Sequence, residues 1–401
     1  MLFGALRCCS LGEMMKQETK IKIGILVACS STLGYMCITP ALADITAAFP
    51  QVPLILSQLI ITLPSFTLMV FSLVAGWSER RVGGKRLIVI GTSLQLVGGV
   101  FPFFIHSSIV GLLFSSAVIG AGLGLMMQAT NSMICSIYSG SERSRMLGYN
   151  ATCVNVGSLV FSFLGGQLSQ FSWFAPYLAF LMMIPVLVIS LRWLPHEPKK
   201  ENTLIEAHQQ IPSASGGLPA LFFIGALYFT AQNAFHTNSS LYIKELALGG
   251  SVVSSLVTSS NAVGGIIGGI VFGKLERRIG EQIQSVALVI SATGFLLMIS
   301  LPMISGIITG GALIGAAFAM INASGTWLIS RRCVEEQRSK IIAGYLSVVN
   351  LFAASSPLLL SALSEITLGN SPRKRLCVAC ILIAVAAAIC WKVLRRKDIS
   401  S

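Results

Sequence analysis

Twelve stretches of apolar residues, each long enough to cross a membrane, dominate this sequence of 401 residues. The hydrocarbon core of a bilayer requires about 20 apolar residues per helix. The stretches cover 23–45, 52–77, 86–105, 109–137, 146–169, 172–194, 218–243, 249–274, 283–303, 304–330, 341–366 and 376–394. Lipid admits only helices or closed barrels, and these stretches are too long and too uniformly apolar for barrel strands. The sequence therefore predicts an all-α membrane protein with twelve transmembrane helices.

The composition excludes a soluble protein and argues against a nucleic-acid-binding one. Charged residues make up 11% of the chain, against about 25% in soluble domains. The net charge is +13, but the basic residues are dispersed over the termini and the gaps between apolar stretches. They form no single stripe that could follow a phosphate backbone. We expect lipid headgroups, and neither nucleic acid nor nucleotide, to meet these charges.

A ten-residue phrase occurs twice, as GWSERRVGGK at 76–85 and as GKLERRIGEQ at 273–282, 197 positions later. A second echo pairs ERSR at 142–145 with QRSK at 337–340, 195 positions later. Repeats at this interval, each containing an even number of helices, indicate two halves inserted in the same direction. We predict a first six-helix half at 1–194, a linker at 195–217 and a second six-helix half at 218–401.

The basic residues also predict the orientation in the membrane. With the amino terminus inside, all but four of the 28 Lys and Arg residues fall in inner segments; the exceptions are Lys244, Arg373, Lys374 and Arg375. Inner loops of membrane proteins carry an excess of Lys and Arg. We predict a multi-pass protein of the cell membrane with both termini in the cytoplasm. The residues leave open whether the chain starts at Met1, Met14 or Met15.

The repeated phrase resembles the cytoplasmic signature of the major facilitator superfamily, and this resemblance covers nearly the whole chain. Gly76, Arg81, Gly83 and Lys85 match in place, whereas Arg80 stands where the family has an acidic residue. The resemblance implies that the two copies of the phrase form a cytoplasmic gate that latches the halves. The candidate gate residues are Gly76, Glu79, Arg80, Arg81, Gly83, Lys85, Gly273, Glu276, Arg277, Arg278 and Gly280.

Two further stretches resemble the twelve-helix drug:proton antiporter branch of that family. Leu33-Gly34 followed by PALADI at 40–45 is similar to its first-helix signature. In the fifth stretch the glycine spacing of its antiporter motif is reproduced by Gly148, Gly157, Gly165 and Gly166. Phe161-Ser162 stand where that motif has Gly-Pro, and Ala117 stands where the fourth-helix signature has Arg.

Uncharged polar residues within the apolar stretches are candidates for a substrate cavity. In the family, helices one, four, seven and ten line a central passage, with helices two, five, eight and eleven beside them. The alternative for each residue is an ordinary hydrogen bond between helices, worth about 0.6 kcal/mol. The candidates are Thr39, Gln128, Asn131, Asn155, Gln232, Asn233, His236, Asn261, Asn322 and Asn350.

No Asp, Glu, Lys or Arg lies deep in any of the twelve stretches. A charge at the bilayer centre costs about 2.5–3.5 kcal/mol, so membrane proteins place one there mainly for function. A strongly charged substrate is therefore disfavoured. Asp44, at the end of the first stretch, and His236, in the seventh, are the candidates for proton coupling, although each has an ordinary structural interpretation as well.

Together these features predict a monomeric secondary transporter, working by alternating access, that exports small lipophilic or weakly polar compounds without a cofactor. Proton coupling stays open. An importer or uniporter of a neutral solute is the nearest alternative. A non-transporting receptor or scaffold, and a membrane-embedded enzyme, are remoter ones, since the loops are short and the four His residues are dispersed.

Overall fold

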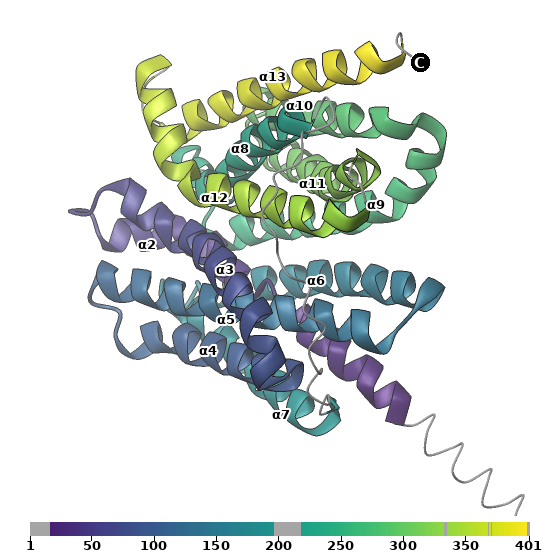
Figure 1. Cartoon of the computed structure of the whole chain (residues 1–401). Coiled ribbons are helices and arrows are strands. Elements are labelled where there is room, and N and C mark those ends of the chain that lie inside the picture. The colour runs from purple at the N-terminus through teal and green to yellow at the C-terminus, as the bar shows by residue number, and fades with distance from the viewer. Residues whose placement is uncertain (1–16, 196–217, 333–334, 368, 370, 399–401) are drawn as a thin grey trace, which may run out of the picture.

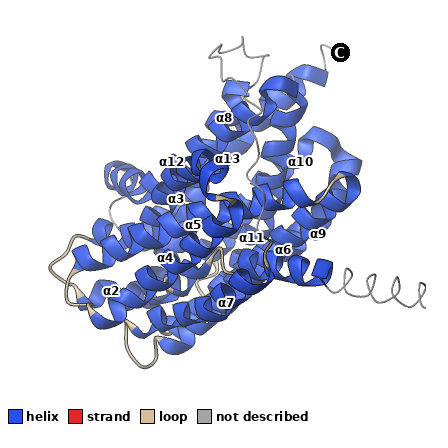
Figure 2. Cartoon of the chain, turned by 60° about the horizontal axis from the view of Figure 1, so that its bottom comes forward, coloured by secondary structure: helices blue, strands red, loops and turns tan. Residues whose placement is uncertain are grey.

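The computed structural model describes residues 17–195, 218–332, 335–367, 369 and 371–398. All regular structure in this part of the chain is helical (Figure 2). The first half contains the helix Gln17–Ser30, η1 (Gly34–Cys37), η2 (Thr39–Ala41), α2 (Leu42–Ala48), α3 (Leu54–Val82), α4 (Gly84–Phe104), α5 (Ile109–Ile137), α6 (Gly140–Leu168), η3 (Ala175–Met182) and α7 (Met183–Trp193). The second contains α8 (Leu218–Glu245), α9 (Ser251–Ile279), η4 (Gly280–Gln282), α10 (Ile283–Ser300), α11 (Ile304–Arg332), α12 (Glu335–Thr367) and α13 (Pro372–Asp398).

The helices account for twelve membrane crossings. Ten helical segments in the described part are long and apolar enough to span a bilayer, and a bent pair near the amino terminus makes eleven. One of the ten, 251–300, is 50 residues long and consists of α9 and α10 joined by the short turn η4. At about 1.5 Å per residue a straight helix of this length would be more than twice as long as a bilayer core is thick. This segment therefore crosses twice, and the predicted number of helices is confirmed.

The first span departs from the continuous helix expected over 23–45. The helix Gln17–Ser30 ends early, and the chain continues through η1 and η2 into α2, bent by 44°. Pro40 lies in η2 and has no backbone N–H to continue an α-helix. Ser31 donates its hydroxyl to the carbonyl of Ala28 at the break. An apolar count could not show this interruption, because Ser30, Ser31 and Thr32 at the break still leave the stretch apolar enough to pass as one span.

The chain folds into two bundles that lie against each other (Figure 1). One buried hydrophobic cluster draws only on residues 218–390, and two others draw only on residues 25–194. The bundles meet where α6 packs along α9 and where α3 packs along α12. The division at 195–217 stays a prediction, because nearly all of that linker lies outside the described residues.

The repeat seen in the sequence reappears in the helix ends and in helix packing. Gly83 and Gly280, which are 197 positions apart, follow α3 and α9 with φ values of 87° and 55°. Glycine adopts this left-handed region without the cost that a side chain would add. Both phrases therefore end a helix. Gly120 lies against the backbone of Pro64 in α3, and Gly315 lies in the same way against Asn261 in α9.

Candidate functional site

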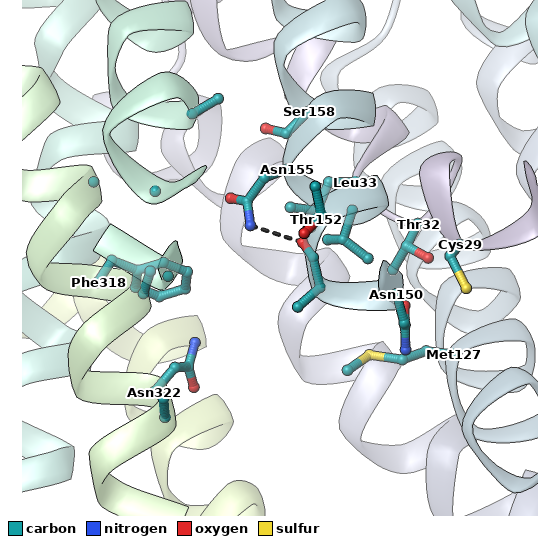
Figure 3. Close-up of a pocket in the computed structure, with 18 of the residues that line it drawn as sticks. Cys29, Thr32, Leu33, Met127, Asn150, Thr152, Asn155, Ser158, Phe318 and Asn322 are labelled. Atoms are coloured by element: carbon teal, nitrogen blue, oxygen red, sulfur yellow. Dashed lines mark hydrogen bonds between the residues drawn. The ribbon is translucent and has the colours of Figure 1, made fainter. Parts of the chain in front are cut away.

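A cavity of about 820 Å³ lies between the two bundles (Figure 3). Its described lining comes from the first span and from α3, α5, α6, α8, α9, α11 and α12, whereas α4, α7, α10 and α13 contribute none of it. These are the helices that the family resemblance places around a central passage. The volume falls within the range of about 300–1,000 Å³ that is usual for small-molecule sites.

The cavity opens at one end of the molecule. Its lining reaches Arg145, Leu147 and Tyr149, which are exposed residues near the start of α6. We call this the open end, and it also contains the turns at Gly83 and Gly280. The opposite end, where α2 meets α8, is the closed end.

Seven of the predicted cavity residues lie on its wall. They are Asn155, Gln232, Asn233, His236, Asn261, Asn322 and Asn350, from α6, α8, α9, α11 and α12. Asn150 is an additional carboxamide of the lining, and Phe229 and Phe318 contribute aromatic rings. None of the described lining residues is Asp or Glu, and Arg145 is the basic residue at the mouth. The wall is thus mainly apolar and carries several separate carboxamide side chains.

Three predicted cavity residues lie outside this lining. Leu123, Met127 and Thr130 bring one face of α5 to the cavity. Gln128 and Asn131 each follow a member of that face by one residue, which turns them about 100° away on a helix of 3.6 residues per turn. Asn131 accepts a hydrogen bond from Asn150 instead, at 2.8 Å.

The third, Thr39, is fully buried in η2 and lies 3.8 Å from the sulfur of Met36. The sequence identified all three as polar residues of a span. It could not give the rotation of their helices about the cavity.

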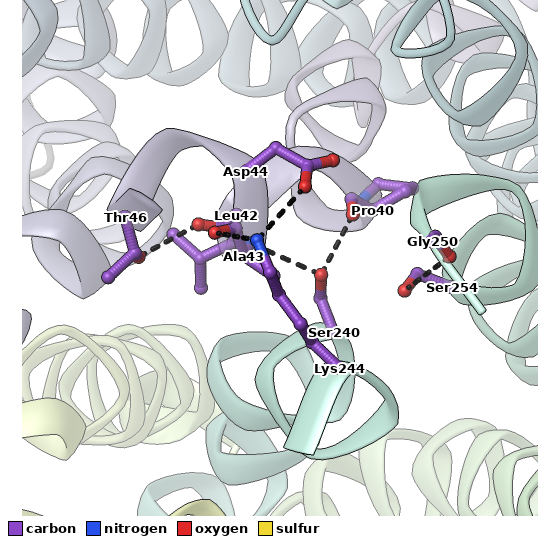
Figure 4. A network of polar contacts seen from close by, with 9 residues as sticks. All are labelled: Pro40, Leu42, Ala43, Asp44, Thr46, Ser240, Lys244, Gly250 and Ser254. Carbon is purple, nitrogen blue, oxygen red and sulfur yellow. Dashed lines mark hydrogen bonds and ion pairs between the residues drawn. The ribbon is translucent and has the colours of Figure 1, made fainter. Parts of the chain in front are cut away.

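At the closed end, α2 and η2 of the first bundle are joined to α8 of the second (Figure 4). Ser240 Oγ donates to the carbonyl of Pro40 at 2.8 Å and accepts from the backbone N–H of Ala43 at 3.3 Å. Lys244 Nζ lies 3.4 Å from Asp44 Oδ1 and 3.3 Å from the Ala43 carbonyl. The proton-coupling candidate Asp44 is therefore one partner of an ion pair between the bundles, and it is not part of the cavity lining.

A second polar contact between the bundles is centred on Gln58 of α3. Its amide nitrogen donates to Asn238 Oδ1 at 2.9 Å and to the Thr237 carbonyl at 3.2 Å, both in α8. Its amide oxygen accepts from Arg375 Nη1 of α13 at 3.3 Å, and Arg375 Nη2 donates to Ser361 Oγ at 3.1 Å. Gln58 and Arg375 are 0% and 1% exposed, so this contact is shielded from water.

Neither Gln58 nor Arg375 is among the candidate functional residues predicted from the sequence. The positive charge of Arg375 placed it in an outer loop, just before the stretch 376–394, but α13 begins at Pro372 and its fourth residue points inward. In the sequence, Gln58 is a glutamine within the apolar stretch 52–77, and this is the signal that could have indicated the contact.

The predicted gate residues lie at the open end, at the ends of α3 and α9. A methyl group added to Gly76, Gly83, Gly273 or Gly280 would meet nothing within 4 Å. Trp77 is 66% exposed, and the Arg81 guanidinium lies 4.6 Å from its ring centre. The side chain of Arg80 lies outside the described part. The two copies of the phrase are thus not packed against each other at these glycines in this conformation.

The glycines of the antiporter-like motif lie along α6 and have different surroundings. Gly148 lines the cavity with free space around it, whereas Gly157 lies directly against the carbonyl of Ser30 and Gly165 against that of Cys37. Gly166 lies against Ser255 of α9, in the other bundle. Three of the four glycines therefore permit close helix packing.

His236 lies in α8, one turn beyond Gln232, with its ring 5.2 Å from that of Phe235. Its Nδ1 is buried without a hydrogen-bond partner among the described residues. Within the same part of the chain, no three His, Cys, Asp or Glu residues are grouped as a metal site would require.

A duplicated bundle of twelve membrane-spanning helices around one central cavity defines a membrane transport protein. The family model described as the Major Facilitator Superfamily matches residues 24–307, and the chain belongs to this family of transporters. A curated relative, Multidrug resistance protein 2 of Bacillus subtilis (strain 168), is 23% identical over 220 residues. That alignment covers 52% of this chain and only about half, 54%, of the relative.

Solved transporter structures share the whole fold. The POT family transporter PepTSo has a TM-score of 0.74 at 12% identity, over 96% of this chain and 99% of that one. The nucleoside transporter NupG, crystallised as a mutant, has a TM-score of 0.73 at 11% identity, over 93% and 99%. A bacterial homologue of the lysosomal transporter Spinster, in an inward-facing and unoccupied conformation, has a TM-score of 0.68 at 13% identity, over 94% and 97%.

Proposed function

We propose that this protein is a secondary exporter of small lipophilic or weakly polar compounds that works by alternating access. The observation that carries the proposal is the cavity between the bundles, whose described wall combines apolar side chains with uncharged carboxamides. Such a wall suits a substrate with little charge, since a buried ion without a partner is costly. The relative that is named as a multidrug resistance protein supports the direction of transport.

The arrangement of the two ends supports alternating access. We assign the open end to the cytoplasm, because the positive-inside bias places the turn at 77–85 and the start of α6 on that side. In this assignment the structure is an inward-open state, with Gln58 and Lys244 closing the outer side. Export requires the bundles to rock, so that these contacts separate while the ends of α3 and α9 approach each other.

Transport by the reconstituted protein tests this proposal. Proteoliposomes are screened with uncharged antibiotics and dyes while a pH gradient is imposed across the membrane. Flux that requires the protein and follows the gradient supports a proton-coupled exporter. Transport that is indifferent to the gradient for every compound contradicts proton coupling. The absence of protein-dependent flux for all compounds contradicts the proposed function.

His236 is the proposed proton-coupling residue, because its imidazole lines the cavity and is a side chain that can bind and release a proton. We expect His236→Gln, which keeps a polar side chain that cannot take up a proton, to abolish the pH dependence of transport. The measurement is the initial rate of flux between about pH 5 and pH 8. A pH profile identical to that of the wild type would exclude this role.

The second candidate function is import or uniport of a neutral solute. The fold is shared with a transporter named for nucleosides, and a carboxamide-lined wall suits such a solute equally well. Counterflow, measured from each side of oriented vesicles, distinguishes an exporter from a facilitator that exchanges equally in both directions.

A further inference from the structure

Three carboxamides of the cavity wall share one hydrogen-bonding pattern. In Asn155, Asn233 and Asn350, on three different helices, the amide nitrogen donates to the backbone carbonyl four residues earlier, at 2.9, 3.0 and 2.8 Å. A carbonyl can only accept, so the nitrogen must be the atom that faces it. Each carboxamide oxygen is thereby left for another partner, and these side chains can offer a ligand acceptors.

Asn155 shows where such an oxygen points. Its Oδ1 extends from α6 toward the second bundle (Figure 3). A methyl group added to Gly265 of α9 would lie only 2.8 Å from that oxygen. The acceptor therefore reaches the space between the bundles, where a bound molecule would touch both of them.

One buried donor complements these acceptors. Gln232 is 1% exposed and lines the cavity, and its Oε1 accepts from Tyr228 at 3.1 Å. Its Nε2 is buried without a partner among the described residues. A buried amide without a partner costs about 1–3 kcal/mol, and an acceptor group on a ligand would remove that cost.

An aromatic surface lies beside these polar groups. Phe229 and Phe318 line the cavity from α8 and α11, with their rings edge to face and their centres 5.9 Å apart. Rings of this kind favour flat apolar groups. A cation gains no carboxylate here, because the described lining contains no Asp or Glu and Arg145 lies at the mouth.

We infer that the substrates of this cavity are uncharged molecules that combine an aromatic ring with several O–H or N–H donors, and that permanent cations, which find no carboxylate in the described lining, bind more weakly. This inference rests on the proposed function and narrows its substrate class. The ring packs on Phe229 and Phe318, the donors bind the oxygens of Asn155, Asn233 and Asn350, and an acceptor binds Gln232.

Three probes separate charge from hydrogen bonding in an equilibrium binding assay on the full-length protein. Chloramphenicol is uncharged and carries a ring, two hydroxyls and an amide N–H; its diacetate lacks both hydroxyl donors; tetraphenylphosphonium is a permanent cation without donors. We expect chloramphenicol to bind, its diacetate to bind about 2- to 12-fold more weakly for each lost hydrogen bond, and tetraphenylphosphonium to bind more weakly than chloramphenicol.

Two variants at one position test the direction of the effect. Asn155→Leu should weaken chloramphenicol binding by about 2- to 12-fold, the value of one hydrogen bond. Asn155→Asp keeps the shape, adds a carboxylate and should raise tetraphenylphosphonium binding by roughly tenfold or more. Gln51→Glu makes the same chemical change in an exposed turn outside the cavity and should change neither. Gel filtration and thermal unfolding verify that each variant is folded.

Wild-type binding of tetraphenylphosphonium as tight as that of chloramphenicol would overturn the inference. So would equal binding of the diacetate, or failure to bind chloramphenicol by protein that exchanges some other compound. These results leave transport intact and reject only the substrate class. A protein that exchanges no compound of any charge instead contradicts the proposed function, and the substrate class with it.

Discussion

Replacing Gln58 by Leu should open the closed end of the protein. The three hydrogen bonds that the Gln58 side chain makes with described residues cross from α3 to the other bundle, where they reach Thr237, Asn238 and Arg375. Leucine fills a similar volume and can make none of them. A neutral hydrogen bond contributes about 0.5–1.5 kcal/mol, and one to a charged group about 1.5–3 kcal/mol. Because the three contacts share one side chain, we expect a combined loss of about 2–4 kcal/mol.

A loss of this size shifts the equilibrium toward the outward-open state by roughly 30- to 900-fold. The assay is the distance distribution between spin labels at Gln51 and Glu245, exposed residues of the two bundles at this end, in protein whose ten native cysteines are replaced. We expect Gln58→Leu to add a population at longer distance. The control is Gln170→Leu, since the side chain of Gln170, among the described residues, bonds to Gln167 in its own bundle. Identical distributions for the wild type and Gln58→Leu would show that Gln58 does not hold the closed end together.

Two further predictions concern packing and charge. Gly157→Ala should destabilise the protein by about 1–3 kcal/mol, because its methyl group would overlap the Ser30 carbonyl. The control Gly76→Ala should not destabilise it, because a methyl group there meets nothing within 4 Å. Equal thermal unfolding temperatures of the two variants would contradict this prediction. Glu281→Gln should lower the free energy of unfolding by about 1–3 kcal/mol, because its partner Arg332, at 2.6 Å, is only 4% exposed. The control Glu18→Gln breaks an exposed ion pair and should change the free energy of unfolding little. Equal effects of these two substitutions on thermal unfolding would show that burial of the arginine is unimportant.

Helix number and the repeat could be predicted from the sequence because both depend on local properties. Apolar length decides whether a segment spans a bilayer, and the twelve stretches correspond to the observed crossings. The repeated phrase marks the same local structure twice, a helix ended by a glycine with positive φ, at Gly83 and Gly280. The broken first span could not be predicted in this way, because Ser30, Ser31 and Thr32 at its interruption still leave the stretch apolar enough to pass as one span.

The candidate site could be predicted in kind but not in detail. Asn155 and Gln232 are polar residues of apolar spans, which identified them, and both line the cavity. Gln128 and Asn131 satisfy the same criterion but lie on another face of α5, and helix rotation depends on tertiary packing. Arg375 was misplaced because charge alone suggested an exposed loop, whereas contacts with Gln58 and Ser361 allow it to be buried.

Alternating access requires one cavity that is reached from opposite sides of the membrane in turn. The most direct measurement labels a single cysteine at Ala319, a residue of the cavity wall, with a membrane-impermeant thiol reagent in right-side-out and in inside-out vesicles. We expect labelling from both sides, with the cytoplasmic side faster in the wild type and the outer side faster after Gln58→Leu. Labelling from one side only, in both proteins and under all conditions, would contradict alternating access.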